Sequence, residues 1–141
     1  MVSVNNLFNS LEIILHDDLY KRTDKNQVQD SLVRLESNPS NTFKWFYNRY
    51  EGPFWEESVA FELLDITEIE SHTRSARVEH NFTKQYLVLS EMSANAVLVL
   101  DTLTDHVFTV DFEGGDEKLL RGELDPTWLT FYEFLNAYFD I

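Results

Sequence analysis

The sequence predicts an α+β fold in which helices come first, a mostly antiparallel sheet follows and a helix closes the chain. Up to residue 50, apolar residues recur every three or four positions, which is typical of amphipathic helices. From residue 58 they alternate with polar residues or run continuously, as in strands, and the helical spacing returns after residue 130. The chain has 141 residues, of which 43% are hydrophobic, so we expect one domain over residues 1–141.

Two amphipathic helices are expected before residue 37. The first runs over residues 3–15, where Ser3 can cap the helix. Its apolar side is formed by Val4, Leu7, Leu11 and Ile14. The second runs over residues 26–36 with a similar spacing, and the sequence SNPS then ends it. Its apolar side is formed by Val28, Leu32 and Leu35.

Seven aromatic residues lie within residues 41–55, NTFKWFYNRYEGPFW. At about 100° per residue, four of them fall on one narrow stripe of a third helix. These four are Phe43, Phe46, Tyr47 and Tyr50. The spacing predicts that the stripe belongs to the core. Gly52 is expected to end the helix in a left-handed conformation, and Pro53 prevents its continuation.

The segments after residue 58 predict strands and one short helix. Residues 58–66 alternate apolar with polar or small side chains, which predicts a half-buried strand. Thr67 and Glu70 have the spacing of a capping box, so a short helix is expected there. Residues 86–92 and 95–101 are nearly continuous apolar runs, which suits central strands covered on both faces.

The remaining segments complete the sheet and end in a helix. Residues 106–113 follow the connection DTLTD and are expected to form the second arm of a hairpin. The side chains expected to point inward are Phe108, Val110 and Phe112. A short strand is expected over residues 119–124. In the closing helix Thr130 and Glu133 form a second capping box. Its apolar stripe is formed by Phe131, Phe134, Leu135 and Tyr138.

Three of these segments resemble a known family. The third helix, FKWFYNRYEG over residues 43–52, resembles the Y-K-x-F-L-x-x-Y-N-G helix of the SUKH superfamily, which includes yeast-type cell-wall-assembly regulators and many bacterial immunity proteins. The hairpin VLVLDTLTDHVFTVDFE and the closing TFYEFLNAYF are similar to the corresponding family segments. The resemblance spans residues 41–139 and implies a non-enzymatic binding domain, often one that neutralises a cognate toxin.

The composition argues against several kinds of catalytic site. The chain has no cysteine, so disulfide and thiolate chemistry are excluded. Its four histidines show no metal-ligand spacing such as H-E-x-x-H, and no phosphate-binding loop can be built from four scattered glycines. No serine lies in a G-x-S-x-G turn. We therefore expect no catalytic residue, no cofactor, no bound metal and no enzyme activity.

The net charge predicts the kind of partner. The chain has 25 acidic and 11 basic residues, which gives a formal net charge of −14 at pH 7. Such a field repels nucleic acid and attracts a basic protein, so we expect a protein partner and a monomer or a weak dimer. The first 18 residues lack both the basic start of a signal peptide and a membrane-spanning apolar run, which predicts a cytoplasmic location without membrane contact.

Trp45 is the first candidate partner-binding residue. It lies on the side of the third helix opposite the aromatic stripe, together with Lys44, Asn48 and Arg49. Two interpretations stay open. Another segment such as the N-terminal helix covers the ring, or the ring is an exposed anchor, since tryptophan is enriched among the residues that dominate binding energy.

Four acidic residues form the second candidate. They lie within seven positions, on the outward side of the last hairpin strand and on the loop after it, beside Gly114 and Gly115. They are Asp111, Glu113, Asp116 and Glu117, which we call the acidic quartet. Crowded like charges cost stability, so a functional reason such as attraction of a basic partner is plausible beside the simpler interpretation of a solvated surface.

The sequence therefore predicts a SUKH-type protein-binding domain. The favoured function is that of an immunity protein that neutralises a basic, nuclease-type bacterial toxin. Two alternatives stay open: a regulator that scaffolds a cell-wall or signalling enzyme, and an acidic mimic of nucleic acid that blocks a DNA-binding protein.

Overall fold

The computed structural model describes residues 4–56 and 59–141. Within these ranges the chain forms six α-helices, one 3-10 helix and a three-stranded antiparallel sheet, which confirms the α+β class and the order of helices, sheet and helix. The helices are α1 (Val4–Ile14), η1 (Asp18–Tyr20), α2 (Gln27–Leu35), α3 (Asn41–Arg49), α4 (Ile66–Glu79), α5 (Gly115–Leu120) and α6 (Phe131–Tyr138). The strands are β1 (Tyr86–Val88), β2 (Ala96–Asp101) and β3 (Val107–Asp111).

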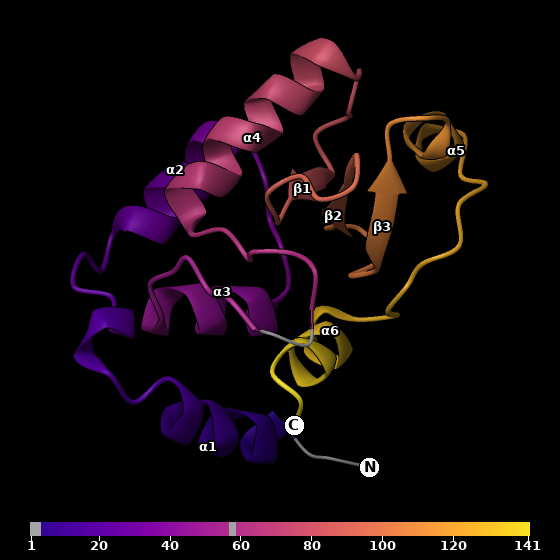
Figure 1. Ribbon diagram of the computed structural model, residues 1–141. Coiled ribbons are helices and arrows are strands. Elements are labelled where there is room, and N and C mark those ends of the chain that lie inside the picture. The colour runs from indigo at the N-terminus through magenta and orange to yellow at the C-terminus, as the bar shows by residue number, and fades with distance from the viewer. Residues whose placement is uncertain (1–3, 57–58) are drawn as a thin grey trace.

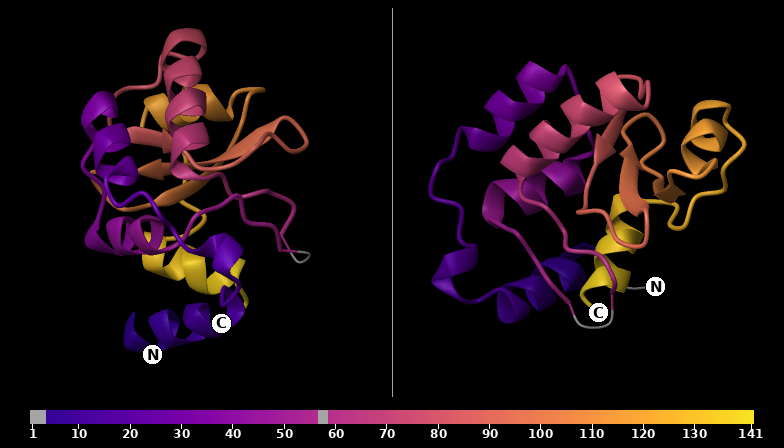
Figure 2. Two further views of the ribbon diagram at one scale, coloured as in Figure 1. Left: turned by 90° about the vertical axis from the view of Figure 1, so that its left-hand side faces the viewer. Right: turned by 45° about the horizontal axis from the view of Figure 1, so that its top comes forward.

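The helices cover the sheet from two sides (Figure 1). α4 packs against β1 with α2 beside it, and α5 packs against β3. α3 and α6 contact each other below the sheet, and α1 contacts α6 at the end of the molecule farthest from α5 (Figure 2). Among the residues described, no helix combines the length and the apolar character needed to cross a bilayer.

The sheet separates two hydrophobic clusters, as expected for strands buried on both faces. In β1 and β2 alternate side chains enter different clusters because the side-chain period of a strand is two. Leu87 and Leu100 are paired across the strands and join the large cluster with α3 and α6. Val88 and Val99 are also paired and join the smaller cluster under α4 and α5. The face of the second cluster carries the site described below.

The first two helices form where the apolar spacing predicts them, with one correction in α1. Leu7 and Leu11 are fully buried, but Ile14 is 38% exposed and Leu15 is buried in its place. The buried residues Leu7, Leu11 and Leu15 are therefore four positions apart, and Leu15 directly follows the helix. The expected cap, Ser3, lies outside the described residues. In α2 the predicted apolar side is buried, and its members are Val28, Leu32 and Leu35.

The aromatic stripe of α3 is buried as predicted, but the helix ends differently. Its members are Phe43, Phe46, Tyr47 and Tyr50, all at most 2% exposed. The helix ends at Arg49 with Tyr50 in an extended conformation, and Gly52 does not adopt a left-handed conformation. The fully buried Arg22 side chain donates to the carbonyl oxygens of Tyr47 and Tyr50 and pairs with Asp65, and these bonds fix the turn. The predicted glycine cap was therefore wrong.

The strand expected over residues 58–66 was also wrong. Within residues 59–66 the backbone makes only isolated bridges, in which Leu63 pairs with Phe54 and with Ser90. The backbone nitrogen of Leu63 also donates to the Tyr138 hydroxyl, at 3.2 Å. Leu63, Leu64, Asp65 and Ile66 are consecutively buried, so the alternation of a strand stops there. The segment fills a gap between α3, α6 and the sheet, and no continuous strand partner faces it.

The helix expected at Thr67 is a full 14-residue helix, and the predicted capping box does not form. α4 begins at Ile66, and the Thr67 hydroxyl donates to Glu68. Glu70 instead accepts two hydrogen bonds from Arg34, each of 2.9 Å, which ties α2 to α4. The Arg34 guanidinium lowers the pKa of Glu70 to about 2, with a further contribution from the Arg74 side chain.

The short strand predicted near residue 120 does not form, whereas the predicted closing helix does. Residues 119–124 form no strand; Leu119 and Leu120 end α5, and a turn follows. By contrast, α6 forms as predicted, because the Thr130 hydroxyl accepts a hydrogen bond from the Glu133 backbone nitrogen at 3.0 Å. The predicted stripe of α6 is buried, and it consists of Phe131, Phe134, Leu135 and Tyr138.

Candidate partner-binding site

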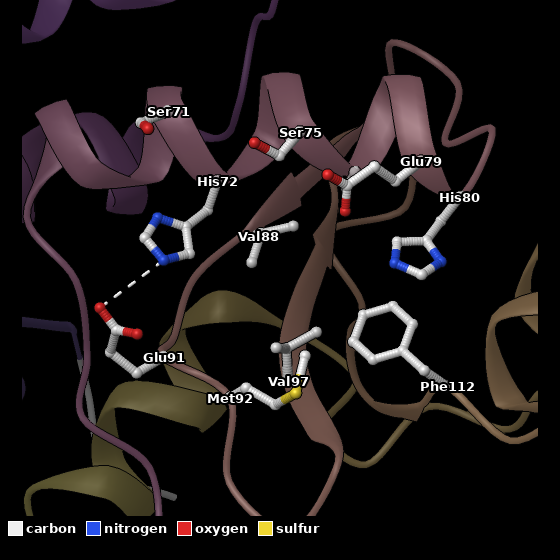
Figure 3. Close-up of a pocket in the computed structure, with 11 residues that line it drawn as sticks. Ser71, His72, Ser75, Glu79, His80, Val88, Glu91, Met92, Val97 and Phe112 are labelled. Atoms are coloured by element: carbon white, nitrogen blue, oxygen red, sulfur yellow. Dashed lines mark ion pairs between the residues drawn. The ribbon is translucent and has the colours of Figure 1, made fainter.

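A hollow of about 260 Å³ lies between α4 and the sheet, and we call it the α4 groove (Figure 3). Its floor belongs to the smaller hydrophobic cluster and is apolar. The floor residues are Ala76, Val88, Val97, Met92 and Phe112. Ala76, Val88 and Val97 are at most 5% exposed, whereas Met92 is 55% exposed at the open side. The groove thus offers a fixed apolar surface with an open entrance.

The rim of the α4 groove is polar and titratable. His72, Glu79 and His80 come from α4 and Glu91 comes from the loop between β1 and β2, and all four surround Val88 and Val97 in Figure 3. On α4 the lining positions are spaced by three and four residues around Ala76, so the helix presents them on one side. A binding surface with an apolar centre and charged edges results.

Each histidine of the rim faces a carboxylate. In His72 the Nδ1 atom lies 2.9 Å from the Glu68 carbonyl oxygen and the Nε2 atom lies 3.6 Å from Glu91. In His80 the Nδ1 atom lies 3.6 Å from Asp116, and the ring stacks on Phe112 with 4.2 Å between centroids. Among the described residues, neither ring is hydrogen-bonded to the groove serines, Ser71 and Ser75, so the rim holds no activated hydroxyl nucleophile.

Within residues 4–56 and 59–141, no three His, Cys, Asp or Glu side chains are placed to share an ion. Two carboxylates, two imidazoles and an apolar floor can instead contact a cationic organic group.

The structure divides the acidic quartet by role. Asp111 accepts hydrogen bonds from the backbone nitrogens of Gly115, at 3.1 Å, and Glu113, at 2.9 Å. These two bonds lower the pKa of the Asp111 carboxyl and fix the start of α5. Asp116 faces His80 and so connects the quartet to the α4 groove, whereas Glu113 and Glu117 extend from exposed positions.

The loop expected after the last hairpin strand is instead the start of a helix. Gly114 has a φ of 119°, a left-handed conformation that favours glycine, and α5 begins directly after it at Gly115. Two acidic side chains in the first turn of α5, Asp116 and Glu117, favour this helix because they face its positive end. The quartet therefore stands on an ordered strand end and helix.

Trp45 is placed away from the quartet and from the α4 groove. Its ring stacks on Phe8 of α1, with centroids 3.4 Å apart and planes 14° apart, and the Arg49 guanidinium lies 5.6 Å from the ring centroid. α1 thus covers one side of the ring, and the indole remains partly exposed. α3 and α5 lie far apart in both figures, so Trp45 and the quartet do not form one site.

Sequence reasoning missed two exposed features. It tested the four histidines only for metal-ligand spacing and did not group His72 and His80 with Ala76 and Glu79, although these four positions have the spacing of one helix face. That spacing was the available signal for the groove. It also named Trp45 as the candidate exposed aromatic residue, whereas Trp55, which follows the helix, is 62% exposed. Trp55 lies outside α3, so helical spacing could not place it.

The net negative charge is concentrated in residues 86–141. Residues 86–141 contain 11 of the 25 acidic residues and only two of the 11 basic ones. They form the sheet, α5 and α6, drawn in salmon to yellow in Figure 1. The other nine basic residues precede residue 86, so the negative potential is expected to be strongest near residues 86–141.

Comparison with known proteins gave no match, either to a family model or to a curated protein.

Proposed function

We propose that this chain is a non-enzymatic protein-binding domain, specifically an immunity protein that holds a basic toxin domain inactive. The observation that carries the proposal is the excess of acidic over basic residues in residues 86–141, 11 against two, in a segment that also supplies one wall of the α4 groove. Electrostatic attraction acts before contact and directs a partner of opposite charge toward this segment.

Three further features support a protein partner. The net charge of −14 opposes binding to phosphate backbones. Within the described part of the chain, no hydrogen bond joins the rim histidines to a serine, and an apolar floor with charged edges suits recognition. Residues 43–52 resemble the SUKH helix, and the aromatic stripe of this segment is buried in α3. The resemblance supports a role in immunity to toxins, which is common in that superfamily.

The proposal is tested by capture followed by kinetics. The tagged chain is used to capture partners from its native source, and captured proteins are identified by mass spectrometry. We expect a basic protein whose toxic activity falls when this chain is added in equal amount. Failure of the captured protein to lose activity, or capture of acidic proteins alone, would contradict the immunity proposal.

The electrostatic part has its own variant. Glu113→Gln with Glu117→Gln removes two exposed charges and leaves Asp111 at the start of α5. Association with the captured partner should slow by about threefold or more at low salt, and by less above 0.15 M salt, where charges are screened beyond about 8 Å.

The matched control removes two charges from α2, by Asp30→Asn with Glu36→Gln. It should leave the association rate nearly unchanged, since both residues lie outside residues 86–141. Equal slowing by both variants would show that only total charge matters, and equal rates for all three proteins would exclude steering by the quartet.

A further inference from the structure

We propose that the α4 groove is the site that receives an arginine side chain of the basic partner. The identity of the partner rests on the proposed function, whereas the affinity of the groove for a guanidinium group does not. The groove combines what such a side chain needs: an apolar floor for the aliphatic stem and carboxylates at the rim for the charged end.

The two rim carboxylates are poorly compensated within the chain. Among the described residues Glu79 has no hydrogen bond or ion pair, and Glu91 faces only His72, at 3.6 Å. Glu70, by contrast, pairs with Arg34 at 2.9 Å and with Arg74 at 3.1 Å. Glu79 and Glu91 therefore leave a negative potential over the groove that an external cation can neutralise.

The floor explains why the cation should be carried on a long apolar stem. Val88 and Val97 lie between the two carboxylates in Figure 3, with Met92 at the open side. A volume of about 260 Å³ is several times the roughly 30 Å³ that one water occupies in the liquid, so a whole side chain fits. An inorganic cation would leave this apolar surface uncovered.

The aromatic wall favours arginine over lysine. Phe112 and His80 form a stacked pair at one end of the groove, with 4.2 Å between their centroids. A planar guanidinium stacks on such rings and loses less hydration than an ammonium group, and it can bond two carboxylate oxygens at once. The site is tested at pH 8.

The first experiment uses a small probe and needs no partner. N-acetyl-arginine methylamide is titrated into the ¹⁵N-labelled chain, with the citrulline analogue as a neutral control of the same shape. We expect roughly millimolar binding of the arginine probe, with amide shifts confined to α4, Val88, Glu91, Val97 and Phe112. The citrulline analogue should bind at least about tenfold more weakly.

Variants decide whether the rim carboxylates are responsible. Glu79→Gln with Glu91→Gln should abolish the arginine-specific shifts, and the α2 control, Asp30→Asn with Glu36→Gln, should preserve them. All four side chains are exposed, so folding is expected to survive, and the dispersion of the amide spectrum checks it. Equal binding of the citrulline or lysine analogue, shifts outside the groove, or an unaffected rim variant would overturn the proposal.

The second experiment uses the captured partner. The rim variant should weaken its binding by about tenfold or more, and replacing one arginine of the partner by lysine or glutamine should remove that sensitivity. A partner that binds the rim variant as tightly as wild type would overturn the assignment of the groove and leave the immunity proposal standing. Conversely, arginine-specific probe binding with no basic protein captured would support the groove and contradict the proposed function.

Discussion

Replacement of Trp45 by alanine tests whether this ring joins two helices or serves a partner. The ring stacks on Phe8 at 3.4 Å and lies edge-on to Tyr50, with centroids 5.9 Å apart. Each such aromatic pair contributes about 0.5–1.5 kcal/mol, and the contact with Arg49 adds about 0.5–1 kcal/mol. Since the ring is only partly buried, we expect Trp45→Ala to lower the free energy of unfolding by about 2–3 kcal/mol, below the cost of a fully buried tryptophan.

The assay is urea denaturation followed by circular dichroism, with Trp55→Ala as the matched control. Trp55 is 62% exposed, so its replacement should cost less than about 1 kcal/mol. Phe8→Ala alone and combined with Trp45→Ala completes a double-mutant cycle, and a coupling energy above about 0.5 kcal/mol is expected. A loss below about 1 kcal/mol for Trp45→Ala, or additive effects with Phe8→Ala, would refute the view that the stack fastens α1 to α3.

Three further substitutions test other parts of the structure. Asp65→Asn should lower the free energy of unfolding by about 3 kcal/mol in urea denaturation, because Arg22 stays buried without its main carboxylate. Glu36→Gln, which removes an exposed ion pair with Lys84, should lower it by less than about 1 kcal/mol, and equal losses for the two variants would contradict this difference. Glu70 has a pKa of about 2 against an ordinary 4.5, so the stability that it provides is present above pH 4.5 and is lost as the pH falls toward 2. The difference in unfolding free energy between wild type and Glu70→Gln should therefore shrink from about pH 5 to pH 2, and a constant difference would exclude this linkage. Thr130→Ala should cost about 1 kcal/mol through loss of the α6 cap, whereas an unchanged urea midpoint would show that the cap contributes nothing.

The sequence predicted those elements whose burial follows from local spacing. In α2, α3 and α6 one stripe of apolar residues faces the core, and each stripe is buried as expected. β1 and β2 lie within the apolar runs that predicted them, because their side chains are apolar on both faces and both faces are covered. The strand predicted over residues 86–92 was too long, since β1 ends at Val88 and Ser90 makes only an isolated bridge.

The failures occur where contacts distant in sequence decide the local structure. Leu63 makes isolated bridges with Phe54 and Ser90, and its backbone nitrogen donates to the Tyr138 hydroxyl. The path of this segment is therefore set by separate contacts with several elements and not by pairing along one strand. The sequence could not show that Gly52 is not the C-terminal cap of α3, because the turn after this helix is fixed by Arg22, which lies 30 residues before Gly52. Apolar spacing carries no information on such partners.

The candidate site was predictable in its charge and not in its shape. The sequence indicated an acidic surface and the quartet, but the α4 groove exists only because the loop that carries Glu91 meets the C-terminal half of α4. The two segments are separated along the chain by β1. Periodicity within α4 could have gathered His72, Glu79 and His80 on one face, but the opposite wall requires the tertiary structure.

The carboxylates of the acidic quartet differ in how far they take part in structural contacts, which limits which of them can be available to a partner. Asp111 holds the start of α5, and Asp116 faces His80, so neutralising either would alter structure as well as field. Glu113 and Glu117 stand at exposed positions. The structural part of Glu117 is limited to the first turn of α5 and to an exposed pair with Arg121 at 3.9 Å, so the main effect of these two residues is on the field. They should therefore govern the rate of approach, whereas Glu79 and Glu91, at the edge of a preformed hollow, should govern how long the partner stays. The rim variant should accordingly raise the dissociation rate, and the variant of Glu113 and Glu117 should lower the association rate; the reverse pattern would show that the two surfaces have been assigned the wrong roles.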